Sequence, residues 1–88
     1  ARDATRIAVS AYVRRMRLAL PVTVRMTRYG PRDLDEGCGL NASLKPVRDG
    51  VADAFGVDDA DKRYAWIYQQ ERAPFYGVRV ELEEPGNV

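Results

Sequence analysis

Histidine is absent from this 88-residue chain, cysteine occurs once, and no apolar run is long enough for a membrane helix. Without histidine, the chain has no His-based acid–base chemistry and no His-dependent nucleophilic triad. A single cysteine, Cys38, excludes an internal disulfide and a Cys-rich zinc site, and we expect a free thiol in a reducing compartment. With no signal-peptide pattern either, the sequence predicts a cytoplasmic protein that has no membrane partner.

The length predicts a single domain that spans residues 1–88. Of these residues 45% are hydrophobic, which is enough for a core but a marginal one for a monomer of this size. A second apolar stripe on the first predicted helix, formed by Ile7, Ala11 and Leu18, would suit either a subunit contact or packing under a strand that precedes the helix. We therefore expect a homodimer.

The net charge of +1 conceals two regions of opposite sign. Residues 1–32 hold eight arginines and one acid, whereas residues 33–88 hold six basic and twelve acidic residues. A basic surface for phosphates beside an acidic centre for metal is typical of a nucleic-acid enzyme. A solvated arginine-rich helix explains the basic third equally well.

Hydrophobic periodicity predicts five elements. Apolar residues recur every three or four positions over 4–20, which predicts a helix stopped by Pro21, and residues 22–29 alternate as in a half-buried strand. A second helix is expected from Ser43, as N-cap, to Gly56, as C-cap, with Pro46 in its first turn. Strands are expected at 62–70 and 75–83, joined as a hairpin. The predicted fold is α+β: helix, strand, acidic loop, helix, strand, strand, with a sheet of about three strands covered by two helices.

Aromatic residues alternate along the 62–70 strand. Tyr64, Trp66 and Tyr68 therefore share one face of it. Core or cross-strand packing is the favoured explanation of such a stripe, and a base-stacking platform is the less frequent one.

Acidic residues cluster before and after the second predicted helix. Asp33 and Asp35 lie on one side of an extended segment, and Asp58 and Asp59 follow the helix. If the far end of the helix folds back, these carboxylates can share a hard cation, and without histidine or cysteine partners they favour magnesium, manganese or calcium. For either pair alone, turn chemistry on a solvated surface is the more frequent explanation.

Five basic residues are candidate phosphate contacts. Lys45 is either a helix lysine paired with Asp49 or a cation that stabilises charge developing on a phosphate. The others are arginines, two in the first helix and two that flank the acidic loop: Arg14, Arg17, Arg28 and Arg32. Surface arginines also commonly pair with neighbouring acids.

The order of these residues resembles the RusA family of Holliday junction resolvases. The resemblance runs from Val22 to about Glu83, and its motif residues are Arg32-Asp33-Leu34-Asp35, Asn41, Lys45, Asp49 and Val57-Asp58-Asp59-Ala60. The chain looks like a phage or prophage member. The resemblance implies a magnesium-dependent, homodimeric endodeoxyribonuclease that resolves branched DNA in recombination and repair. It also implies catalytic metal ligands at Asp33, Asp35 and Asp59, with Mg²⁺ as the metal and Mn²⁺ as its alternative, and an auxiliary catalytic role for Lys45.

Two features depart from the family pattern. Glu36-Gly37-Cys38-Gly39-Leu40 intervenes where the family has an Asn directly after its second Asp, and an alignment anchored on Asn41 puts Leu40 at an Asp position. The alternative function is therefore a catalytically inactive RusA-like DNA-binding protein with a dismantled metal site. A small interaction protein with purely structural acids is a further alternative. Family members also usually open with a strand before the first helix, whereas this chain begins with the helix.

Overall fold

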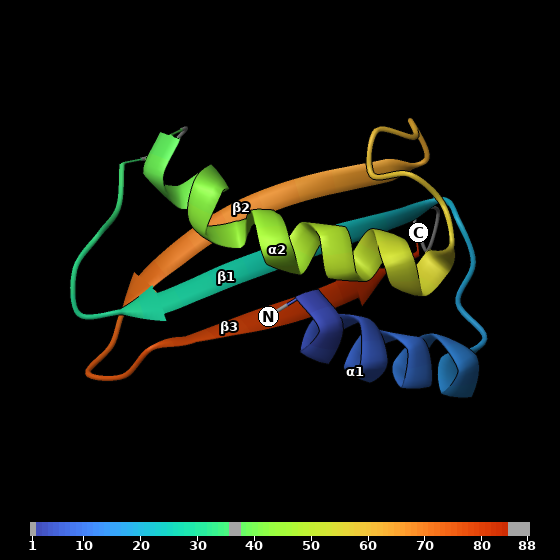
Figure 1. The fold of residues 1–88 in the computed structure, drawn as a ribbon, viewed down its shortest axis with the longest axis horizontal. Helices are drawn as coiled ribbons and strands as arrows, with labels where there is room; N and C mark the ends of the chain where they lie inside the picture. The colour runs from blue at the N-terminus through green and yellow to red at the C-terminus, as the bar shows by residue number, and fades with distance from the viewer. Residues whose placement is uncertain (1, 36–37, 85–88) are drawn as a thin grey trace.

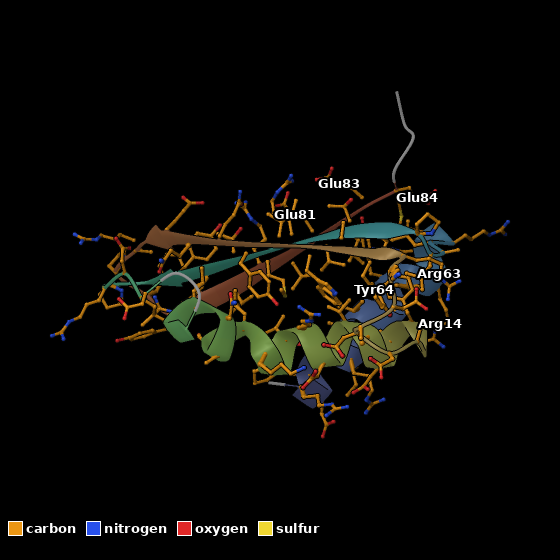
Figure 2. The ribbon with its side chains drawn as sticks, turned by 90° about the horizontal axis from the view of Figure 1, so that it is seen from above. Arg14, Arg63, Tyr64, Glu81, Glu83 and Glu84 are labelled. Carbon is orange, nitrogen blue, oxygen red and sulfur yellow. The ribbon has the colours of Figure 1, made fainter. Side chains whose placement is uncertain are left out.

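The computed structural model describes residues 2–35 and 38–84. Its elements are α1 (Arg2–Met16), β1 (Val22–Gly30), α2 (Cys38–Phe55), β2 (Tyr64–Arg72) and β3 (Gly77–Glu83). The strands form one sheet, and both helices lie on the same side of it (Figures 1 and 2). The predicted α+β fold and its element order are confirmed. No helix in the described ranges is long and apolar enough to cross a membrane.

β1 is the central strand of the sheet. It pairs with β2 in parallel and with β3 antiparallel, so the strand order is β2-β1-β3. The predicted hairpin is therefore wrong, because β2 and β3 lie on either side of β1. Their four-residue linker spans up to about 13 Å, enough to bridge the roughly 10 Å between strands two positions apart. It crosses the end of β1, where the Ala73 N–H donates to the Gly30 carbonyl at 2.9 Å.

The core lies between α2 and β1. The buried side chains of α2 are Leu40, Leu44, Val47, Val51 and Ala52, and those on the inner face of β1 are Val22, Val24 and Met26. The aromatic stripe of β2 faces the same core, with Tyr64 buried and Trp66 and Tyr68 packed beside it. The packing interpretation of this stripe is confirmed.

α1 is shorter than predicted because it ends on its own cap and not at Pro21. Arg17 adopts a left-handed conformation with φ 54°, and the Leu18 N–H donates to the Val13 carbonyl at 3.0 Å, which closes a Schellman motif after Met16. Of the predicted apolar face, Val9 is buried, whereas Tyr12 and Met16 are 38% and 52% exposed.

α2 begins five residues before the expected Ser43, at Cys38, and Pro46 lies inside the helix. Pro46 has no N–H to donate to the carbonyl of Ala42, four residues earlier in the helix. The helix tolerates this because Pro46 and Ala42 are both exposed, so the Ala42 carbonyl faces water. The predicted C-cap at Gly56 is confirmed by its φ of 70° and by the hydrogen bond from the Val57 N–H to the Ala52 carbonyl.

α1 packs against α2 at Gly50. A Cβ atom at this position would lie 2.6 Å from the Arg2 carbonyl oxygen and 2.7 Å from Thr5 Cβ. The close approach of the two helices therefore requires glycine here.

Candidate functional site: the cluster around Asp59

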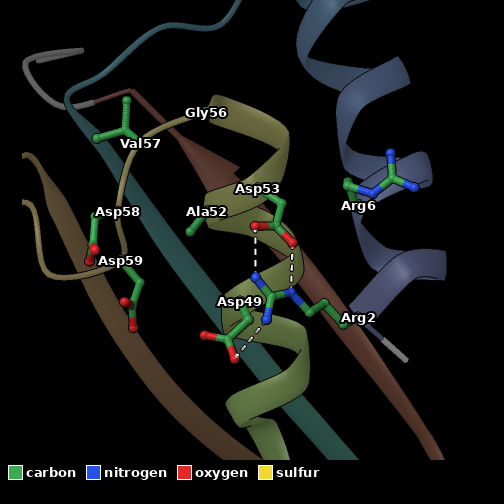
Figure 3. Close-up of a pocket in the computed structure, with 9 residues that line it drawn as sticks. All are labelled: Arg2, Arg6, Asp49, Ala52, Asp53, Gly56, Val57, Asp58 and Asp59. Atoms are coloured by element: carbon green, nitrogen blue, oxygen red, sulfur yellow. Dashed lines mark hydrogen bonds and ion pairs between the residues drawn. The ribbon is translucent and has the colours of Figure 1, made fainter.

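Asp59 lies in the loop 56–63, which folds back over α2 beside Asp49 (Figure 3). Its carboxylate accepts hydrogen bonds from Lys45 Nζ at 3.0 Å and from Arg48 Nε at 2.8 Å. Its main-chain carbonyl accepts from Arg48 Nη2 at 3.1 Å and from Trp66 Nε1 at 3.0 Å. Asp59 thus ties the loop to both α2 and β2.

Arg48 is the residue that links these elements. Its Nη1 donates to the Tyr68 hydroxyl at 2.7 Å, and its guanidinium lies 4.6 Å from the centroid of the Trp66 ring, within cation–π range. The side chain is only 24% exposed. Sequence reasoning missed Arg48, although its position three residues after Lys45 puts both cations on one side of the helix.

Lys45 bridges two carboxylates. Its Nζ lies 2.8 Å from Asp49 Oδ1 as well as 3.0 Å from Asp59, which confirms the interpretation of Lys45 as a partner of Asp49. Hydrogen bonds to Asp49 and then to Asp59 raise the pKa of Lys45. Hydrogen bonds from Lys45 and then from Arg48 hold the pKa of Asp59 below its ordinary value. The cluster is therefore a set of charged groups that satisfy one another.

Asp33 and Asp35 lie at the other end of α2. The Asp33 carboxylate is 3.4 Å from Arg72 Nε and is 55% exposed. The exposed Asp35 contributes its main-chain carbonyl, which accepts from the Leu40 N–H in the first turns of α2 at 2.8 Å. Neither carboxylate is among the hydrogen-bond or ion-pair partners of the Asp59 cluster within the described residues.

Gln70 fixes the loop between these two acids. Its side-chain amide accepts from the Leu34 N–H and donates to the Leu34 carbonyl, each at 2.8 Å. The side-chain amide thereby makes the two hydrogen bonds that the backbone of a neighbouring strand would make with Leu34. The position of Asp33 and Asp35 is set by this contact with β2.

The three predicted metal ligands do not come together. Asp35 is held at Leu40 of α2, and Asp59 is held at Arg48 of the same helix. These two positions are about 12 Å apart along the helix axis. In residues 2–35 and 38–84, no group of three or more His, Cys, Asp or Glu side chains could hold a metal ion. Asp33 and Asp59 also already face cations. A magnesium ion shared by Asp33, Asp35 and Asp59 does not fit this arrangement, and magnesium dependence stays a prediction.

A pocket of ≈ 580 Å³ opens beside Asp59, between α1, α2 and the loop (Figure 3). On its α1 side, Arg2 donates from Nε and Nη2 to the two oxygens of Asp53 at 2.7 and 3.0 Å. Arg2 also lies 3.9 Å from Asp49. These contacts hold the pKa of Asp53 below its ordinary value, chiefly through the hydrogen bond from Arg2. Three of the pocket's four acids, Asp49, Asp53 and Asp59, therefore already pair with cations of the protein.

The four predicted DNA-contacting arginines form two groups. Arg14 and Arg17 are exposed at the end of α1, close to the start of β1, and in the described ranges they form no ion pair. Arg28 and Arg32 lie at the far end of β1, about 25 Å away, where Arg28 Nη1 donates to the Arg32 carbonyl at 2.8 Å. Figure 2 shows Arg14 at the same end of the molecule as Arg63.

Comparisons with known proteins add no relative. No family model matches the chain, and neither a curated protein nor a solved structure matches it. The resemblance to RusA resolvases therefore rests on the motif residues alone.

Proposed function

We propose that the chain is a RusA-like protein that binds branched DNA, and that its acidic residues serve the fold and do not form a nuclease centre. The pairing of Asp59 with Lys45 and Arg48 carries this proposal. A carboxylate that accepts from two cations has its charge compensated within the protein, and a metal ion would have to displace both partners. This favours the binding function over the magnesium-dependent one.

The arginines at the C-terminal end of α1 support contact with phosphates. Arg14, Arg15 and Arg17 follow one another on and after the last turn of α1, and all three are exposed. Cations at the C-terminal end of a helix are also favoured by the helix dipole. Such a surface binds nucleic acid through phosphate contacts and counterion release, and the preference for a junction over a linear duplex is what the resemblance adds to the proposal.

A magnesium-dependent junction endonuclease is the second candidate function. It is favoured by one observation: α2 and the returning loop bring Lys45 within 3.0 Å of Asp59, two residues that the resemblance assigns to one site. Asp33 and Asp35 would have to move along α2 to join them. Catalytic roles for all four residues remain predictions.

A gel assay separates the two functions. The protein is mixed with a four-way junction or a linear duplex of the same length, first in EDTA and then with millimolar magnesium. Junction binding in EDTA without cleavage in magnesium supports the proposal. Magnesium-dependent cleavage replaces it with the second candidate, and failure to bind either DNA rules out both.

A charge-reversal pair tests the proposed surface. Arg14→Glu with Arg17→Glu should weaken junction binding, and each lost phosphate contact should flatten the slope of log affinity against log salt by about 0.9. The matched control, Arg6→Glu with Arg72→Glu, makes the same change in net charge at exposed positions away from the end of α1. Equal effects of the two pairs would show that only net charge matters.

A further inference from the structure

The outer edge of β3 is open along a groove. β3 is an edge strand that pairs only with β1 among the described residues. A groove of ≈ 660 Å³ runs beside it, between β3 and α1, and its apolar lining comes from Ala4, Ala8 and Tyr12 on α1 and from Val78, Val80 and Leu82 on β3. Val78 is 44% exposed and Tyr12 is 38% exposed. The groove is therefore a mainly apolar surface, with Glu81 and Glu83 also in its lining, and it borders a row of free backbone groups.

α1 lies alongside β3, on the side away from β1 (Figure 1). One side of α1 packs on α2 at Gly50, whereas Ala4 and Ala8 are exposed and face the groove. Alanine side chains leave room for a backbone to approach a helix closely. The geometry suits one more strand, hydrogen-bonded to β3 and covered by α1.

The sequence of β3 is complementary to itself. A two-fold axis perpendicular to a sheet pairs an edge strand antiparallel with its own copy and keeps each residue on its face of the sheet. Centred on Val80, the middle residue of Gly77–Glu83, this register pairs the whole strand. Val80 then faces Val80 of the second copy, Val78 faces Leu82, and Arg79 faces Glu81 twice.

Neighbouring registers lose this complementarity. Centring the pair on Arg79 sets two arginines opposite each other, and centring it on Glu81 sets two glutamates opposite each other, which is unfavourable. The other open edge, β2, offers no such match, because its charged residues Glu71 and Arg72 lie at one end and would face Ala65 and Tyr64.

We propose that two copies of this chain associate through β3, centred on Val80, so that the two sheets continue into one and each α1 covers the partner's β3. The groove beneath α1 suits an added strand, and the charge pattern of β3 selects a second copy of the chain as the source of that strand. The proposal does not depend on DNA binding, since it concerns a different face from the basic end of α1. Its test therefore needs no DNA.

Charge reversal across the two-fold axis tests the register. Sedimentation equilibrium of the full chain should show a dimer at micromolar concentrations. Arg79→Glu, or Glu81→Arg, puts like charges opposite each other twice per dimer and should raise the dissociation constant at least about tenfold. The double variant Arg79→Glu/Glu81→Arg restores opposite charges and should return the constant to within about threefold of the parent.

Lys62→Glu is the matched control, because it removes an exposed positive charge away from β3 and should leave association unchanged. Circular dichroism confirms that each variant folds, so that a lost dimer is not a lost fold. A parent that stays monomeric at about 100 µM overturns the proposal. So does a double variant that associates no better than the two single variants.

A cysteine pair gives a second, covalent measurement. In a Cys38→Ser background, Val80→Cys places a thiol on the two-fold axis, where facing Cβ atoms lie about 5 Å apart and a disulfide can close on mild oxidation. Val78→Cys is the control, because position 78 faces Leu82, and the two introduced thiols would be about 13 Å apart along the strand. Efficient cross-linking of the Val80→Cys variant but not of the Val78→Cys variant supports the register. Equal yields, or no cross-linking of the Val80→Cys variant, overturn it.

Discussion

Replacing Arg48 with methionine should release the loop 56–63 from the sheet. The side chain is largely buried and donates three hydrogen bonds, to the Asp59 carboxylate, the Asp59 carbonyl and the Tyr68 hydroxyl. It also stacks on the Trp66 ring. Methionine has a similar length and keeps part of the apolar contact, so the change mainly removes polar interactions.

The expected loss of unfolding free energy is about 3 to 4 kcal/mol. Three hydrogen bonds contribute about 1 kcal/mol each after the exchange with water, and the stacked guanidinium contributes about 0.5 kcal/mol more. For a domain of this size, such a change lowers the melting temperature by roughly 12 to 25 °C. Arg48→Lys keeps the charge but cannot reach all three acceptors, so its loss should be intermediate.

Urea denaturation followed by fluorescence measures this effect directly, because Trp66 is the single tryptophan and contacts Arg48. Lys45→Met is the matched control: it also removes two contacts with acids, but the Lys45 side chain is 56% exposed. Exposed ion pairs add little to stability, so this variant should unfold at nearly the parental urea concentration. If Arg48→Met is no less stable than Lys45→Met, the loop is not held by Arg48.

Three further outcomes follow from particular contacts. Gly50→Ala should lose about 2 kcal/mol in urea denaturation despite the better helix propensity of alanine, because the new Cβ meets α1 at 2.6 Å. Gln70→Ala should speed amide exchange at Leu34 at least about tenfold in NMR, with little change in global stability. Burial raises the pKa of Tyr64 to about 12. Between about pH 10 and 12 the unfolded phenol ionises while the folded one keeps its proton, so stability should fall as pH rises, and Tyr64→Phe should abolish that part of the decline.

The existence of each element follows from local patterns in the sequence. Alternation along β1 and the i, i+3, i+4 spacing of Leu44, Val47 and Val51 in α2 locate the surfaces that later meet in the core. Element ends were harder to predict, because Arg17 ends α1 in a conformation that usually favours glycine and Pro46 is accommodated within α2.

Strand pairing was not predictable from the same patterns. β2 and β3 alternate as hairpin strands do, yet β1 lies between them, and only the tertiary arrangement decides this. For the candidate site, the i, i+4 spacing of Lys45 and Asp49 predicted their ion pair. The contacts of Asp59 with Arg48 depend on how the loop returns over α2, a tertiary arrangement to which no short-range pattern corresponds.

The central position of β1 bears on how the chain folds. Val22 faces Tyr64 and Thr23 faces Glu83, so each ladder of the sheet closes a loop of about 40 to 60 residues. β1 and β2 are consecutive strands, but the whole of α2 lies between them in the sequence. The entropy of closing these loops is lost before any strand pairing compensates for it. Local hairpin nucleation is not available to this sheet. We therefore expect a high contact order and slow, cooperative folding in which α2 docks on β1 before β2 and β3 add on either side.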